Sequence, residues 1–205
     1  MAIKKAISLK TLMTLNFKTI QLEGFWNEVI GEPEDNFQAM FYGPQKSGKS
    51  TLCLQLCDEL ARFGKVFYNV WEEGKSKKLQ DRVGNLDIKN LDNIFIQKYK
   101  FEEMMDDEFK RRYYKTIVFD SIQYMKFTYD EYKQFHQKYP RKILLFVSQV
   151  NGKGGAKGGT DFGHAVDVTI HCKNGMARVD SRFAEPKNIE IFKRELKAGE
   201  QIPLL

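Results

Sequence analysis

Residues 43–50 are the feature that most restricts what this chain can fold into: a glycine-rich loop ending in lysine and serine. The segment fits the pattern G-x-x-x-x-G-K-[ST], whose glycines allow backbone N–H groups to surround phosphate oxygens. An apolar stretch precedes this phosphate loop and a helical pattern follows it, so a helix directs its positive end at the anion. The context predicts a nucleoside triphosphate site. The residues expected to contact the nucleotide are Gly43, Pro44, Gln45, Lys46, Ser47, Gly48, Lys49, Ser50 and Thr51.

Two further side chains are expected to hold the magnesium ion that accompanies a nucleoside triphosphate. Ser50 ends the phosphate loop, and a hydroxyl at this position of the motif ligates Mg²⁺, while Lys49 reaches the β and γ phosphates. Asp120 follows the apolar run at residues 116–119, and an acidic residue after a buried strand completes such a metal site. The alternative is that Asp120 only caps the segment after it. The sequence therefore predicts ATP and Mg²⁺ as cofactors.

Carboxylate and amide side chains follow two more apolar stretches. Glu72 and Glu73 come after residues 66–71, and Gln149 comes after residues 143–147. Because the carboxyl ends of parallel strands lie at one edge of a sheet, we expect these groups beside the phosphate loop. One of the two glutamates is then placed to orient the attacking water, and Gln149 is placed to contact the γ-phosphate and transmit its loss. The alternative for the glutamates is that both are simply solvated.

Composition limits the class of protein more weakly. The 205 residues carry a net charge of +6 and a pI of about 9.0, which permits a polyanionic partner without requiring one. The apolar runs stay below the roughly 18 residues of a membrane helix. The three cysteines have no C-x-x-C spacing and are expected to be reduced and buried. These features predict a soluble cytoplasmic protein without a membrane partner.

Strand and helix patterns alternate along the chain. Continuous apolar strands separated by helices predict an α/β fold with a mostly parallel central sheet and helices on both faces. The closely spaced last strands are expected to be antiparallel, with a hairpin turn at Asn174 and Gly175. Residues 1–36 are interpreted as a leader or oligomerisation arm, and residues 37–205 as the core. Late strands are predicted at residues 166–172, 176–181 and 189–192, and helices at residues 75–82, 101–113 and 127–139.

Four runs of the chain match a known arrangement: residues 43–51, 66–74, 117–123 and 163–170. On these runs the chain resembles the RecA-like P-loop ATPases, and among them it looks most similar to the ATPase core of RadA/Sms. The Tyr-x-x-x-Glu-Glu and Asp-Ser-Ile-Gln runs are the more discriminating matches. The resemblance extends over residues 24–192. DnaB-type replicative helicases share the same core and a similar Ser-Gln strand end.

The resemblance implies roles for several residues. In the family the glutamate that closes the second strand polarises the attacking water, and this position falls on Glu72. The polar residue after the fourth strand falls on Gln149, and the loop after it, residues 151–160, contacts single-stranded DNA. Lys153 and Lys157 are then the candidate DNA contacts. The family also forms rings with ATP between subunits, which implies a homo-oligomer.

One departure from the family concerns the residue that acts across the subunit interface. RadA/Sms carries a Lys-Asn-Arg-Phe-Gly run near the end of the core, and residues 180–184 of this chain correspond to it. Asp180 takes the place of the lysine, so Arg182 or Arg178 is expected to substitute for it. The cysteine cluster of the family's zinc module is absent from the sequence. The comparison with the family therefore implies a minimal core, of a kind expected in a bacterial or phage-infected cell.

Two functions follow from these interpretations. The first is a DNA-stimulated ATPase of recombination, repair or replication, acting as an oligomer on single-stranded DNA. The alternative is an ATP-dependent switch or scaffold without motor activity, which Asp180 favours because it predicts weak hydrolysis. A small-molecule kinase is less favoured, because the sequence shows no arginine-rich lid.

Overall fold

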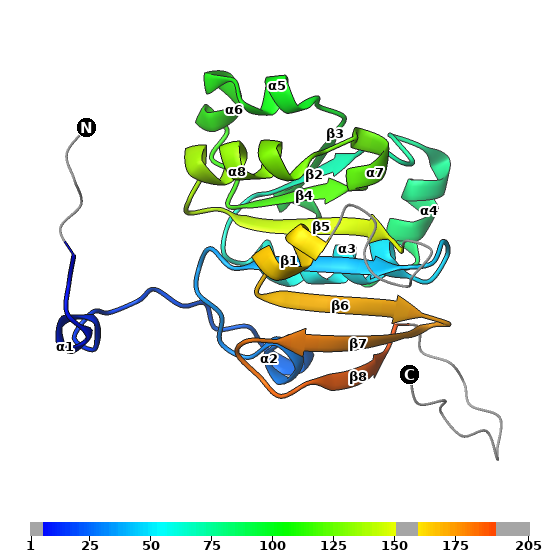
Figure 1. Ribbon diagram of the computed structural model, residues 1–205. Coiled ribbons are helices and arrows are strands. Elements are labelled where there is room, and N and C mark those ends of the chain that lie inside the picture. The colour runs from blue at the N-terminus through cyan, green and yellow to red at the C-terminus, as the bar shows by residue number, and fades with distance from the viewer. Residues whose placement is uncertain (1–5, 151–159, 192–205) are drawn as a thin grey trace, which may run out of the picture.

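The computed structural model describes residues 6–150 and 160–191, which contain an eight-stranded sheet in the order β3-β2-β4-β5-β1-β6-β7-β8 (Figure 1). Neighbouring strands from β3 to β6 are parallel, whereas β7 and β8 are antiparallel. This arrangement confirms the predicted fold class. The strands are β1 (Gln38–Gly43), β2 (Val66–Val70), β3 (Ile94–Gln97), β4 (Thr116–Asp120), β5 (Ile143–Gln149), β6 (Val168–Lys173), β7 (Met176–Ser181) and β8 (Lys187–Glu190).

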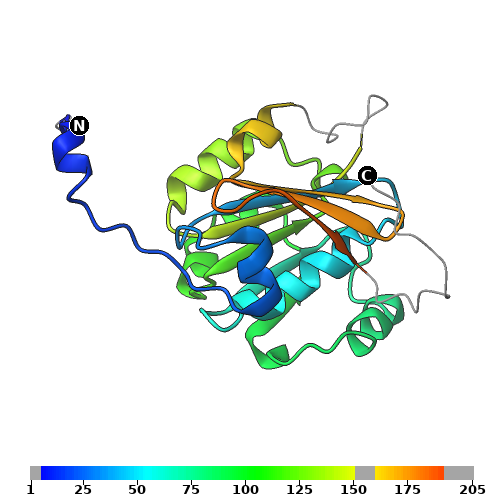
Figure 2. The same ribbon diagram turned by 90° about the horizontal axis from the view of Figure 1, so that it is seen from below.

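Helices cover both faces of the sheet (Figures 1 and 2). One face carries α2 (Gly24–Ile30), α3 (Lys49–Leu60) and α4 (Lys77–Gly84), with the short 3₁₀ helix η1 (Leu91–Asn93) before β3. The helices of the other face are α5 (Phe101–Met104), α6 (Asp107–Arg111), α7 (Ile122–Met125), α8 (Tyr129–Lys138) and α9 (Thr160–Ala165).

Each face of the sheet has its own hydrophobic core, because successive side chains of a strand point to opposite faces. On β5, Leu145 and Val147 join the core under α3, while Leu144 and Phe146 join the core under α8. The central strands are buried on both sides and are therefore apolar throughout. The α3 core is mainly aliphatic, and the α8 core is mainly aromatic.

Local capping moved several predicted boundaries. The helix predicted at residues 101–113 is wrong as a single helix: it is broken into α5 and α6, because the side chain of Asp106 accepts a hydrogen bond from the backbone of Glu108 and starts a new helix. The Ser76 hydroxyl caps α4 in the same way, so that helix begins at Lys77. The last strand lies two residues earlier than predicted, and residue 192 lies outside the described part.

The parallel strands bring their carboxyl ends to one edge of the sheet, which we call the phosphate edge. Gly43 of β1 lies opposite Gln149 of β5. Asp120 of β4 lies opposite Val70 of β2 and Val147 of β5. The phosphate loop therefore shares an edge with the ends of β2, β4 and β5.

Residues 6–18 extend away from the sheet and include α1 (Leu9–Leu12) (Figures 1 and 2). All of these residues are exposed, and the chain enters the body of the protein at Ile20 and Leu22, which are buried. Among residues 6–150 and 160–191, no helix combines the length and apolar character that crossing a membrane requires.

Candidate nucleotide-binding site

The phosphate loop connects β1 directly to α3, as the sequence predicts. Gly43 has φ 155°, and a Cβ atom there would lie 2.0 Å from the carbonyl oxygen of Cys172 on β6, so only glycine permits this close approach. Gly48 has φ 94° and is the N-cap of α3, a left-handed conformation that glycine adopts without a steric penalty. The four residues after Gly43 form the loop, and Ser50 and Thr51 lie in the first turn of α3.

Lys49 is largely enclosed by the loop that it follows. The residue is 8% exposed, and its Nζ donates hydrogen bonds to the carbonyl oxygens of Gly43 (3.1 Å) and Pro44 (2.6 Å). Burial lowers the pKa of Lys49, and the nearby carboxylates of Glu72 and Asp120 act in the opposite direction. The ammonium group is therefore a buried cation at the amino end of α3, where phosphate oxygens are favoured partners.

Asp120 is a buried carboxylate with one oxygen occupied and one without a partner. The Tyr68 hydroxyl donates a hydrogen bond of 2.6 Å to Oδ2, whereas Oδ1 is buried and accepts no hydrogen bond. Burial raises the pKa of Asp120, and the hydroxyls of Tyr68 and Ser50 oppose that rise. A free carboxylate oxygen beside a serine hydroxyl fits Mg²⁺, which takes one or two protein oxygens and completes its shell with water and phosphate.

The described residues hold no group of three or more His, Cys, Asp or Glu side chains that would form a metal site alone. Their three cysteines are free and buried, as expected. A magnesium ion held by Ser50 and Asp120 would therefore take the rest of its ligands from water and phosphate.

The two adjacent glutamates after β2 have different surroundings. Glu73 is held by Arg82 of α4 through two hydrogen bonds of 2.6 and 2.7 Å, and by Lys78 at 2.9 Å. Burial alone would raise the pKa of Glu73, but these hydrogen bonds lower it. Glu72 is exposed, and its backbone N–H donates to the carbonyl oxygen of Asp120 at 3.3 Å. Glu72 is therefore the glutamate whose carboxylate is accessible at the phosphate edge.

Gln149 ends β5 beside Gly43, and a second glutamine holds its backbone. Oε1 of Gln123 accepts a hydrogen bond from the backbone N–H of Gln149 (3.0 Å), and Nε2 of Gln123 donates to the Ser148 hydroxyl (2.9 Å). Gln123 lies on α7, outside the phosphate loop, and the sequence motifs did not predict a role for it. Its place shortly after Asp120 was the available signal.

The basic residues near the end of the core lie at opposite edges of the sheet. Arg178 pairs in register with His171 of β6, level with the end of β1, and its side chain binds Asp180 at 3.1–3.3 Å. Arg182 follows β7 at the edge where β1 begins, and it contacts Asp167 at 3.3 Å. Its side chain is 62% exposed.

The predicted DNA contacts Lys153 and Lys157 lie outside the described residues. Gln149, the last residue of β5, lies at the phosphate edge, and the two lysines come after it in the sequence.

The strand order and the helices on both faces give an α/β fold of the RecA-like type, and two solved structures share this fold. A KaiC-like protein of the archaeon Pyrococcus horikoshii has 17% sequence identity and a TM-score of 0.61, over 85% of this chain and 93% of that one. The flagellar accessory protein FlaH of Methanocaldococcus jannaschii has 16% identity and a TM-score of 0.60, over 83% and 89% of the two chains.

At this identity the likeness establishes the shared fold alone. The sequence matches no protein-family model and no curated protein sequence. The closer resemblance to RadA/Sms or to DnaB-type helicases is therefore not confirmed.

Proposed function

We propose that this protein binds ATP with Mg²⁺ and hydrolyses it. The observation that carries the proposal is the convergence of a buried lysine, a partly unsatisfied buried aspartate and an accessible glutamate at one phosphate loop. The three side chains differ in charge or in surroundings, and they match three tasks of phosphoryl transfer: binding the phosphates, holding Mg²⁺ and orienting the nucleophile. The shared RecA-like fold supports the proposal.

Each side chain has a defined task in this proposal. Lys49 and the amino end of α3 bind the phosphates, and Ser50 and Asp120 hold Mg²⁺. The ion supplies positive charge that offsets the charge developing on the phosphate oxygens. Glu72 orients the attacking water, and Gln149 contacts the γ-phosphate.

Phosphate release from ATP tests the proposal. The wild-type protein should release phosphate in the presence of Mg²⁺, and Lys49→Ala should lose the activity. The exposed Lys65, at the opposite end of β2, provides a control with the same change of side chain. Equal rates in wild type and Lys49→Ala, with Lys65→Ala also unchanged, would assign the activity to a contaminant and overturn the proposal.

We further propose that the protein works as a homo-oligomer. Arg182 lies at the edge of the sheet opposite its own phosphate loop, so it can act on a phosphate loop only in a second copy. Residues 6–18 supply a segment for the contact: Met13, Leu15 and Phe17 are exposed and alternate with polar residues, the pattern of a strand with one apolar face.

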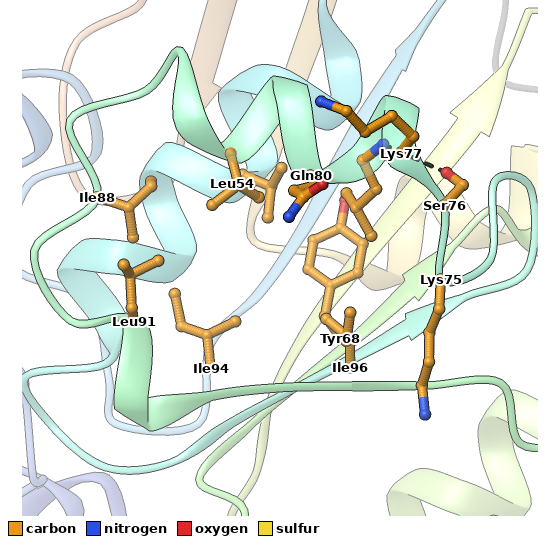
Figure 3. Close-up of a pocket in the computed structure, with 12 residues that line it drawn as sticks. Leu54, Tyr68, Lys75, Ser76, Lys77, Gln80, Ile88, Leu91, Ile94 and Ile96 are labelled. Atoms are coloured by element: carbon orange, nitrogen blue, oxygen red, sulfur yellow. Dashed lines mark hydrogen bonds between the residues drawn. The ribbon is translucent and has the colours of Figure 1, made fainter.

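The surface that best fits residues 6–18 is the outer side of β3, which is an end strand of the sheet. Phe95 and Ile96 of this end strand are exposed, and an extended peptide can pair with such an edge. Beside it, α4 covers a mainly apolar cavity of about 530 Å³ (Figure 3). Sedimentation velocity of a variant lacking residues 2–18 should show loss of the oligomer. Unchanged oligomers would show that residues 2–18 do not make the contact between subunits.

The proposed pathway is DNA recombination, repair or replication, with single-stranded DNA as the partner. It is supported by the basic, glycine-rich sequence of residues 151–160, which follows Gln149 directly. Single-stranded DNA should raise the hydrolysis rate severalfold, and Lys153→Ala with Lys157→Ala should remove the stimulation but keep the basal rate. Binding of labelled strands should also weaken steeply with salt.

The alternative is an ATP-dependent switch or scaffold, which the pairing of Arg178 with Asp180 favours. In that case the hydrolysis rate is low and does not respond to DNA, while ATP still binds.

A further inference from the structure

Tyr68 is a buried polar side chain on β2 that the motifs did not connect with the nucleotide site. The residue is 1% exposed, and its hydroxyl donates a hydrogen bond of 2.6 Å to Oδ2 of Asp120. In the parallel pairing of the two strands Val70 lies opposite Asp120. Tyr68 is therefore two residues before that level, on the same face of β2, and its phenol reaches along the sheet to the carboxylate.

The two oxygens of Asp120 divide into one that is held and one that is available. Oδ2 accepts the hydrogen bond of Tyr68, and Oδ1 has no hydrogen-bond partner. Carboxylates that ligate metals are commonly held by an outer hydrogen bond that fixes their orientation. We propose that Tyr68 is the positioning residue of the magnesium site: its hydroxyl holds Asp120 by Oδ2 and keeps Oδ1 available to the ion. This inference rests on the proposed function.

The surroundings of Tyr68 explain why the hydrogen bond, and not packing alone, sets the position of the phenol. Tyr68 borders the cavity under α4, together with apolar side chains such as Leu54, Ile94 and Ile96 (Figure 3). A ring beside open space loses packing contacts on that side. A hydroxyl turned toward such an apolar space would lose its hydrogen-bond partner, which is unfavourable for a buried polar group. The bond to Asp120 therefore fixes the phenol and the carboxylate together.

A second buried tyrosine offers a matched control. Tyr132 of α8 belongs to the core on the other face of the sheet, and its hydroxyl donates a hydrogen bond of 2.7 Å to Oε1 of Gln38. Tyr68→Phe and Tyr132→Phe each remove one buried hydroxyl and one hydrogen bond of similar length. Only the first change touches Asp120.

The test measures metal affinity directly, with Mn²⁺ as the probe. Protein is mixed with equimolar ADP and titrated with MnCl₂, and free Mn²⁺ is read by electron paramagnetic resonance. Tyr68→Phe should weaken Mn²⁺ binding by about tenfold, the lower end of the effect of outer partners on metal affinity. Tyr132→Phe should bind Mn²⁺ as the wild type does. Affinity for a fluorescent ADP derivative in EDTA should be the same in all three proteins, which shows that the site is folded.

A second measurement asks whether the effect passes through Asp120. In an Asp120→Ala background, Tyr68→Phe should cause no further loss of Mn²⁺ affinity, because the group that it positions is gone. An equal loss in both backgrounds, wild-type Mn²⁺ affinity in Tyr68→Phe, or the same loss in Tyr132→Phe would each overturn the inference. If the wild-type protein binds ADP but takes up no Mn²⁺ when MnCl₂ is added, or binds no ADP, the proposed function itself fails.

Discussion

The phosphate edge and the β7 region contain the same kinds of charged side chain in opposite conditions. At the phosphate edge, Lys49 and Asp120 are buried, and Asp120 keeps one oxygen without a hydrogen-bond partner. On and after β7, Arg178 and Arg182 are exposed and are each paired with a carboxylate of their own chain. Burying a charge without full pairing destabilises a fold, whereas exposed ion pairs contribute little. The proposed function therefore places the ligand at the first region, whereas the ion pairs of the second are completed within the chain.

This difference assigns the two regions to separate steps. Nucleotide binding requires only groups that a single chain brings together at its phosphate edge. In the proposed function, efficient hydrolysis needs a further positive charge, and Arg182 could supply it only to another copy because it lies at the opposite edge. Arg178 lies at the phosphate edge but is bound to Asp180. The predictions below separate binding from hydrolysis on this basis.

The largest expected effect distinguishes the two glutamates after β2. Glu72→Gln should lower the rate of phosphate release by about 100-fold, because a glutamine cannot accept the proton of the attacking water. ATP affinity should stay unchanged, because Glu72 makes no contact that binds phosphate. Glu73→Gln serves as the neighbouring control and should keep the rate. Equal losses in the two variants would contradict the assignment of Glu72.

A smaller effect is expected in the β7 region. Asp180→Ala releases Arg178 from its ion pair, and the rate of hydrolysis in the oligomer should rise severalfold. ATP affinity of the single chain should not change. Steady-state rates at several protein concentrations measure this effect. Adding Arg178→Ala should remove the gain; a gain that persists in the double variant would show that Arg178 is not the group released.

The smallest expected effect is on stability. Glu73→Gln removes the negative charge and one of the two oxygens that accept from Arg82, and should lower the free energy of unfolding by about 1 kcal/mol at neutral pH. Because the folded pKa of Glu73 is lowered from 4.5, its contribution is present above that ordinary value and is lost as pH falls through the lowered one. Urea unfolding of the wild type and the variant at neutral pH and at strongly acidic pH measures the difference in stability with Glu73 ionised and with Glu73 protonated. A difference between the proteins that is independent of pH would refute this account of Glu73.

Residues governed by local rules could be predicted from the sequence. The phosphate loop was identified because its glycines and lysine have fixed tasks at fixed spacing, and Asp120 because it ends an apolar run. The alternation of strands and helices was enough for the fold class. Because the carboxyl ends of parallel strands lie at one edge of a sheet, the predicted fold also gave the positions of Glu72 and Gln149 at the phosphate edge.

Contacts that depend on register or on competing caps could not be predicted. The hydrogen bond between Tyr68 and Asp120 joins residues 52 positions apart, and it exists only because β2 and β4 pair in one particular register. The bonds of Gln123 to the end of β5 depend on how α7 leaves β4. Asp106 divides a helix because its side chain competes for backbone N–H groups. The sequence pattern alone does not show whether such a residue continues one helix or caps a second one.

Calorimetric titration of ATP into the protein tests the central claim most directly. The account predicts one nucleotide bound per chain in the wild type, with the same stoichiometry in Glu72→Gln and loss of binding in Lys49→Ala. The circular dichroism spectrum should show that Lys49→Ala is folded. Binding that survives in a folded Lys49→Ala, or a wild type that binds no ATP, would contradict the claim that the phosphate edge is a nucleotide site.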